Sequence, residues 1–480
     1  MTILIKFIGI SSLLIIGGVE MSLCGQTPRK TPTVPERPIE IARLLSDATI
    51  AVPEIAVDTL VKVAQSTKVR DPSWRLEILV EASRLTEEVK NHVRRKSVPF
   101  PDSSVDTHSG YLSYAYDLKL DRLSLRARIA RAFIPHNRDR ARQIVFSIGG
   151  DLKLKPLVCS DSLVYDVSDI YRATGAVAKA VFSQEEVADG TRGLFIAPWF
   201  ENIQSPSQIA SALELLLEIR GSPVERQILY PALSKAIDRR FDDDRSFTYA
   251  LERDQLESKV ARLVSGTTDA HLKMELLSAF RSFLVKNLHS TRCADNKPKD
   301  KERLPDYVAN ANFLFPEKPL TLEEIKHTEL KGTAEITHYW RSANARRLQQ
   351  EFRGLRGLYS NDSKNKGADV DSEVKTSIFI DNLDSWNASD DETESEIFNQ
   401  KCVLYRTLVG LVPDGKAKKS IVRSYMRFLA NSPTQKQSFI EWMNHAKWLS
   451  SKNNLLFAEL TGELPNPNFN LIVETKRTGI

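Results

Sequence analysis

The sequence predicts an all-α protein: an irregular, α-solenoid-like superhelix of helical hairpins, followed by a less regular helical C-terminal region. Three observations lead to this prediction. Apolar residues recur at helical spacing from about residue 39 to residue 290, two-residue alternation is nearly absent, and Ser-Pro or Asp-Pro pairs open several segments. Because no fixed period matches a named helical repeat, we expect an irregular array.

The first 25 residues have the build of a secretory signal peptide. A short basic start ends at Lys6, a largely apolar run covers residues 7–19, and a more polar stretch ends in small residues at Gly25. Thirteen residues are too few to cross a bilayer core of about 30 Å as a helix. The sequence therefore predicts a removable export signal, a periplasmic or extracellular location, and no transmembrane span in the mature chain.

The end of this signal and the segment after it raise two further points. Cys24 could carry a lipid, but the bulky Leu23 stands where a small residue normally precedes a lipidated cysteine, so ordinary cleavage near Gly25 is preferred. Four prolines between residues 28 and 38 cannot be accommodated in a helix. We therefore expect an extended proline-rich linker over residues 26–38.

The helical array is expected to cover residues 39–290, and an early pair of helices shows its pattern. A helix opened by Pro53 places apolar residues on one face, and the next helix starts with Asp71 as a cap and Pro72 in the first turn. The short break between them favours antiparallel packing on the apolar faces. Ser-Pro openings at Ser205 and Ser222 continue the array.

Changes in composition predict the boundaries after the array. Residues 291–303 are polar and contain Pro298, so we expect a linker there. Residues 304–464 are expected to form the helical C-terminal region, with mobile loops over 360–373 and 388–396, and residues 465–480 an irregular tail. Any sheet should be minor, and the short apolar runs Ser377–Ile380 and Leu471–Thr475 are its expected contributors.

The overall composition restricts the class of partner. Hydrophobic residues make up 41% of the chain and charged residues 27%, which is typical of a folded soluble protein. The net charge of +5 is small for this length. Together with the export signal, this charge argues against a nucleic-acid partner.

The cysteines predict one disulfide. Removal of the signal would leave Cys159, Cys293 and Cys402, an odd number in a compartment where disulfides persist. Cys159 precedes a predicted helix and Cys293 follows one, whereas Cys402 lies within an apolar helical stretch. We predict a Cys159–Cys293 bond with Cα atoms within about 7 Å, and a buried thiol at Cys402. No CxxC motif or clustered His and Cys spacing indicates a metal site, and we expect none.

The densest group of potential chemistry follows two prolines and leads into a predicted helix. It comprises Asp106, His108, Tyr111 and Tyr114. A loop histidine flanked by a carboxylate and tyrosines could serve as an acid–base group or as the rim of a binding site. A helix cap or a contact that holds the loop in place is the alternative interpretation.

A second candidate group lies around the helix after Cys159. Asp161, Tyr165 and Asp169 stand at four-residue spacing, with Asp166 between them, and paired carboxylates with aromatic residues are what a helical-barrel glycosidase or lyase would need. An exposed helix face with an internal ion pair is the alternative, because Asp169 and Arg172 stand three residues apart.

Four segments of the chain carry a resemblance to a known group of proteins. They are DTHSGYLSYAYDLKLDRLSLRARIARA (residues 106–132), CSDSLVYDVSDIYRATGAVAKAVF (159–182), DDRSFT (243–248) and LHSTRCAD (288–295). In these segments the chain resembles uncharacterised exported all-helical proteins of environmental bacteria, over about residues 40–300. The resemblance implies the helical architecture and the export signal, and it implies no activity.

These observations favour a noncatalytic exported helical scaffold that binds a protein or envelope partner. The sequence lacks HExxH, a complete phosphate-binding GxxxxGK[ST] loop and a GxSxG elbow, and no cofactor is expected. Two alternatives stay open. A hydrolase or lyase acting on an envelope polysaccharide, built on a helical toroid, would need the two candidate groups in one cleft, whereas their dispersal favours the scaffold. A lipid-anchored component of an envelope assembly would carry its lipid on Cys24.

Overall fold

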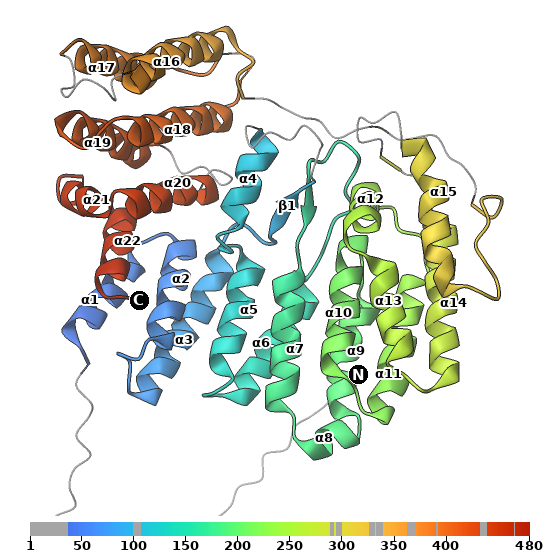
Figure 1. Ribbon diagram of the computed structural model, residues 1–480. Helices are drawn as coiled ribbons and strands as arrows, with labels where there is room; N and C mark the ends of the chain where they lie inside the picture. Colours follow the sequence, from blue (N-terminus) through green and yellow to red (C-terminus); the bar gives the residue numbers. More distant parts are fainter. Residues whose placement is uncertain are drawn as a thin grey trace, which may run out of the picture. The chain divides into compact units, whose positions relative to one another are not determined.

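The computed structural model describes ten ranges of the chain, and all of them belong to one unit that extends from Arg37 to Ile480. The ranges are 37–98, 107–288, 292–293, 300–325, 332, 339–361, 370–389, 392–432, 439–464 and 466–480. Within them the chain forms helices α1 to α22, a few short 3-10 turns and one two-stranded sheet, which confirms the all-α class (Figure 1). The predicted signal peptide and the linker as far as residue 36 lie outside the described residues.

The first part of the chain forms fourteen helices in the described ranges. Their bounds are α1 (Ile39–Thr49), α2 (Pro53–Gln65), α3 (Pro72–Leu85), α4 (His108–Tyr116), α5 (Arg122–Phe133), α6 (Arg138–Asp151), α7 (Ser168–Val181), α8 (Gln184–Ala188), α9 (Thr191–Glu201), α10 (Ile209–Ile219), α11 (Pro223–Ile237), α12 (Asp244–Arg253), α13 (Leu256–Ser265) and α14 (Ala270–Asn287). Helices α2 and α3 pack together, as do α5 and α6. Beyond these pairs, α5, α7, α10 and α13 pack one on the next, and so do α6, α9, α11 and α14. We call these the first series and the second series.

Local sequence explains where these helices begin. Asp71 accepts a hydrogen bond from the Ser73 N–H at the start of α3, and Ser222 and Glu225 exchange hydrogen bonds in a capping box at the start of α11. Gly190 precedes α9 with φ +86°, and a Cβ there would lie 2.9 Å from Cγ1 of Val224. Glycine is therefore required both by the left-handed backbone and by the close approach of α11.

The second part of the chain forms eight helices in the described ranges. Their bounds are α15 (Asp300–Ala311), α16 (Ala343–Asn361), α17 (Val370–Ser385), α18 (Glu394–Leu411), α19 (Lys416–Asn431), α20 (Phe439–Lys452), α21 (Asn454–Thr461) and α22 (Pro467–Arg477). Helices α16 and α17, α18 and α19, and α20 and α21 pack as pairs (Figure 1). Helix α20 also packs on α4, and α22 packs on α1 and α2, so the end of the chain contacts its start.

The structure corrects several predicted boundaries. Helix α16 extends to Asn361 and α17 begins at Val370, so helix covers both ends of the loop predicted over 360–373. Helix α18 begins at Glu394, within the loop predicted over 388–396, because Thr393 starts it with a capping box. Helix α15 already begins at Asp300, inside the predicted linker. Polar residues also occur as helix caps and within helices, and composition alone does not distinguish these positions from loop.

The C-terminal tail is also helical instead of irregular. Asn466 caps α22 by accepting a hydrogen bond from the Asn468 N–H, and Pro467 occupies the first turn. Phe469 and Leu471 are fully buried. Tertiary burial of these apolar side chains therefore explains a short helix that the sequence pattern did not predict.

The sheet is small, but it lies elsewhere than predicted. Strand β1 (Arg95–Ser97) pairs antiparallel with β2 (Leu163–Tyr165), with Lys96 opposite Val164. The runs Ser377–Ile380 and Leu471–Thr475 lie within α17 and α22. A run of four or five apolar residues fits a buried helix as well as a strand, and strands of three residues are too short to show alternation.

The cysteine predictions are confirmed. Cys159 and Cys293 form a disulfide with Cα atoms 5.3 Å apart, and Cys402 is a buried thiol. A buried arginine lies on each side of the bond: Arg245 donates to the Cys159 carbonyl at 2.6 Å, and Arg292 pairs with Asp244 at 3.2 Å. In the described ranges, no helix combines the length and apolar character that a membrane crossing requires.

Candidate functional site

Three of the predicted residues of the first candidate group lie on α4. Thr107 caps this helix by accepting a hydrogen bond from the Gly110 N–H at 3.1 Å, which places His108 in the first turn. Tyr111 follows almost one turn later, and Tyr114 is 49% exposed. Asp106 lies outside the described residues.

His108 and Tyr111 contact residues from the C-terminal part of the chain. The Tyr111 ring centroid lies 5.2 Å from that of Tyr339 and 6.4 Å from that of His445 on α20. The His108 ring meets Tyr339 edge-on at 6.3 Å. Burial lowers the pKa of His108, and the nearby Glu396 carboxylate opposes that shift. Tyr339 is fully buried, so its ring is not accessible to a ligand. We interpret these ring contacts as packing of α4 against the C-terminal part of the chain.

Next to Tyr111 lies a buried polar network that the sequence analysis missed. His445 Nε2 is 3.2 Å from Asn399 Oδ1, and Asn399 Nδ2 donates to the Glu441 carboxylate at 2.7 Å. Ser395 Oγ donates to the other oxygen of Glu441 at 3.1 Å. Burial raises the pKa of Glu441 to about 7 and lowers the pKa of His445, which Arg406 lowers further.

This network joins α18 to α20. Its members come in pairs four residues apart, Ser395 with Asn399 and Glu441 with His445, so each pair lies on one helix face. That spacing, on the faces that carry the apolar residues of these two helices, was the available signal. Because the Glu441 oxygens and both ring nitrogens of His445 have protein partners, the arrangement fixes how the two helices pack.

The second candidate group is a cluster of ion pairs. The Asp169 carboxylate, at the start of α7, has three basic neighbours. Its oxygens lie 2.7 Å from Lys119, 3.0 Å from Arg172 and 3.5 Å from Arg94. The pair with Arg172 is the one that its spacing predicts. Arg94 also lies 3.3 Å from Asp166. Burial acts to raise the pKa of Asp166, but Arg94 and Lys96 outweigh it and hold that pKa below its usual value.

The structure does not bring the two candidate groups together. Helix α4 has nine residues and is therefore about 13 Å long. His108 begins it, whereas Asp117 and Lys119 follow its other end and bind Arg94 and Asp169, each at 2.7 Å. His108 and Tyr111 thus lie in one contact and Asp166 and Asp169 in another, while Tyr114 is exposed. Within the described ranges, no group of three or more His, Cys, Asp or Glu residues is placed to hold a metal ion.

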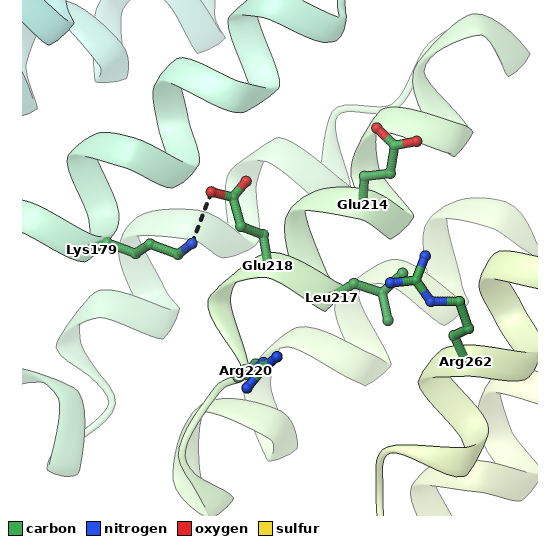
Figure 2. A pocket seen from close by; sticks show the side chains of 6 residues that line it. All are labelled: Lys179, Glu214, Leu217, Glu218, Arg220 and Arg262. Carbon is green, nitrogen blue, oxygen red and sulfur yellow. Dashed lines mark hydrogen bonds and ion pairs between the residues drawn. The ribbon is translucent and has the colours of Figure 1, made fainter.

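A pocket is present elsewhere, where α7, α10 and α13 of the first series meet. It has a volume of about 560 Å³ and is lined by Lys179, Glu214, Leu217, Glu218, Arg220 and Arg262 (Figure 2). Lys179 pairs with Glu218 at 2.8 Å, and Glu214 pairs with Lys259 at 3.4 Å. The sequence analysis selected none of these residues. Each is an ordinary position in or at the end of its own helix, and only the packing of the three helices brings them together.

The second series carries an exposed apolar side chain on each of its four helices. They are Phe146 on α6 (67% exposed), Leu194 on α9 (63%), Val224 on α11 (46%) and Met274 on α14 (59%). We call these four residues the apolar row. The sequence analysis did not identify it, since each residue reads as part of its own helix and only tertiary packing makes the four helices successive neighbours.

Contacts near the row show how closely its helices are packed. A Cβ on Gly149 of α6 would lie 3.5 Å from the Trp199 ring of α9, and Gly190 before α9 lies against Val224 of α11. Gln227 of α11 donates to Asp269, the cap of α14, at 2.8 Å. The row therefore lies along one continuous set of packed helices.

The chain matches no family model, no curated protein and no solved structure. The geometry of the two candidate groups, the pocket and the apolar row is therefore the basis for a functional proposal.

Proposed function

We propose that the protein is a noncatalytic helical scaffold that binds a partner protein. The observation that carries the proposal is the apolar row. Single large apolar side chains are common on protein surfaces, but here each of four successively packed helices exposes one, and we infer that the four share a face that another protein covers.

Burial of the apolar row would supply part of the binding free energy that a stable complex needs. Full burial of one such side chain contributes about 1.5–3 kcal/mol, so covering the exposed parts of all four contributes about 4–7 kcal/mol. The loss of translational and rotational freedom on association costs a similar amount or more. A stable complex therefore needs contacts beside the row, and the half-buried Phe195 and Ile228 on α9 and α11 are available for them.

The hydrolase or lyase alternative required the two candidate groups in one cleft. The four relevant residues that the structure describes, His108, Tyr111, Asp166 and Asp169, lie in two separate contacts instead. The Asp169 side chain is 8% exposed and already pairs with three basic side chains. A proton-transfer role for it would require breaking these pairs, which favours the scaffold.

We propose that the scaffold works outside the cytoplasm. Two features support this location: the signal-like build of the first 25 residues, and the Cys159–Cys293 disulfide, a bond that persists in oxidising compartments. A lipid on Cys24 would make the protein an anchored component of an envelope assembly. Intact-mass analysis of the mature N-terminus distinguishes the lipidated form from the free form.

The test of the scaffold is loss of its partner when the row is made polar. The row variant carries Phe146→Ser, Leu194→Ser, Val224→Ser and Met274→Ser. A matched control carries serine at four exposed apolar residues outside the row: Ile39, Val80, Ile378 and Leu455. Both sets are exposed, so both variants should keep the helical circular dichroism spectrum and nearly the same urea midpoint.

The readout is co-purification after crosslinking of the exported protein in the cells that produce it. We expect partner recovery to fall at least tenfold for the row variant and to stay at the wild-type level for the control. Equal recovery with both variants would show that the row is not the binding face, and the proposal would fail.

A further inference from the structure

The pocket of the first series holds two guanidinium groups that have no partner among the residues that the structure describes. Within the described part of the chain, the side chains of Arg220 and Arg262 form no hydrogen bond and no ion pair. The other charges have partners: Figure 2 shows Lys179 joined to Glu218, and Glu214 pairs with Lys259. The charge left over in the pocket is therefore positive.

The backbone of Arg220 indicates that its side chain has a role. Arg220 ends α10 with φ 47° and ψ 54°, the left-handed conformation, which costs about 1–2 kcal/mol for a residue with a Cβ. Glycine is the usual residue at such a position. Gly221 is the next residue, yet it does not have a positive φ. Gly221 serves another purpose, since a Cβ there would lie 3.2 Å from Cβ of Glu225.

Lys119 shows what a charged side chain does at another left-handed position. Its φ is 55°, close to that of Arg220. Lys119 Nζ forms a 2.7 Å ion pair with Asp169, so its side chain meets a partner inside the protein. Arg220 has the same backbone conformation, but its side chain has no partner in the described ranges. The natural complement of Arg220 is an anion that comes from outside.

We propose that this pocket binds the carboxylate side chains of an acidic peptide segment, with Arg220 and Arg262 as the donors. A guanidinium presents paired N–H groups that match the two oxygens of a carboxylate. Leu217 of α10 lines the same pocket, where it can contact the methylene groups of a glutamate (Figure 2). The volume of about 560 Å³ lies within the range of small-ligand pockets, about 300–1,000 Å³.

The remaining charges select a carboxylate over a phosphate dianion. Glu214 and Glu218 line the same pocket, and Arg220 and Arg262 lie at the C-terminal ends of α10 and α13, where the helix dipole is negative. These groups oppose a second negative charge on the ligand. A singly charged carboxylate on each arginine is the better match.

The pocket and the apolar row lie on different series of helices. Identification of the ligand as a peptide rests on the proposed scaffold function, whereas the affinity of the pocket for a carboxylate does not. The experiment therefore uses a defined probe instead of the natural partner. The probe is an acetylated, amidated hexapeptide of glutamate, compared with the same peptide made of glutamine and with inorganic phosphate.

Calorimetric titration of the full chain measures binding to the wild type and to two double variants. The pocket variant carries Arg220→Gly and Arg262→Gln. The control carries Arg43→Gln and Arg131→Gln, two exposed arginines without side-chain partners in the described residues. We expect the glutamate peptide to bind the wild type and the control equally, the pocket variant at least tenfold more weakly, and the glutamine peptide not to bind.

Three outcomes would overturn the inference: no binding of the glutamate peptide to the wild type, equal weakening in both variants, or phosphate binding as tight as peptide binding. Urea unfolding of both variants shows that a loss of binding is not a loss of folding. If the peptide fails while the row variant still loses its partner, the inference falls and the scaffold function stands.

Discussion

The ion-pair cluster around Asp169 and the pocket around Arg220 differ in whether their charged side chains have partners within the protein. Asp169 is 8% exposed and has three basic partners from three different segments. Arg220 is exposed and has none among the described residues. The two sites even share a backbone feature, since Lys119 and Arg220 are both left-handed.

The difference separates charges that hold the fold from charges that are free to bind a ligand. A charge in the interior must be paired, because an unpaired buried charge costs several kcal/mol. A solvated guanidinium carries no such cost, so it can stay unpaired in the folded protein and bind an external ligand. Substitutions at the two sites should therefore differ in both the size and the sign of their effect on stability.

The largest effect is expected at Asp169. Asp169→Ala removes the carboxylate and leaves Arg94 and Lys119 with one partner fewer, so the free energy of unfolding should fall by about 3 kcal/mol. Urea denaturation at pH 7 measures this change. Asp139→Ala is the control, because Asp139 is exposed on α6 and its loss should change the free energy by less than about 0.5 kcal/mol. Equal effects of Asp169→Ala and Asp139→Ala would show that the ion pairs of Asp169 do not stabilise the fold.

A second paired carboxylate extends the comparison to acid pH. Asp58 of α2 lies 2.7 Å from Arg128, 3.3 Å from Lys62 and 3.4 Å from Lys447 of α20. Burial acts to raise its pKa, but these basic groups outweigh it and lower the pKa from 3.8 to about 2. The folded state thus binds this proton more weakly than the unfolded chain does. The resulting stability is present above pH 3.8 and is lost as the pH falls through 2.

We therefore expect the stability advantage of the wild type over Asp58→Asn to shrink by about 2 kcal/mol on acidification from pH 5 to pH 2. Urea denaturation over that range measures the difference between the two proteins, which cancels the titration of other groups. A difference that does not change with pH would show that Asp58 is not held ionised by its partners.

The smallest effect, and the one of opposite sign, is expected in the pocket. Arg220→Gly relieves the left-handed strain and removes no internal contact, so it should stabilise the fold by about 1 kcal/mol. Arg262→Gln has no strain to relieve and should change the free energy by less than about 0.5 kcal/mol. The urea midpoints of the single variants check both values. A destabilised Arg220→Gly variant would show that the side chain holds the fold, as Lys119 does.

The sequence alone was sufficient for features set by neighbours in the chain. Helices follow from apolar periodicity and from caps such as Asp71 and Ser222, because helical hydrogen bonds join residues four apart. The ion pair of Asp169 with Arg172 was equally local and is observed, although Asp169 is buried and does not lie on the exposed helix face of that interpretation. The cysteine pairing was accessible because only three of the four cysteines follow the signal-like segment and one of these lies in an apolar helical stretch.

Only the tertiary structure decided which distant groups meet. Asp58 and Lys447 are 389 positions apart, and the pairing of Lys119 with Asp169 depends on how the segment after α4 returns to α7. The apolar row and the Arg220 pocket have the same origin, since each helix contributes one or a few ordinary surface residues and packing brings them together. Local periodicity specifies which face a helix buries. Packing of the whole chain decides which helices are its neighbours, and therefore which residues form the sites between helices.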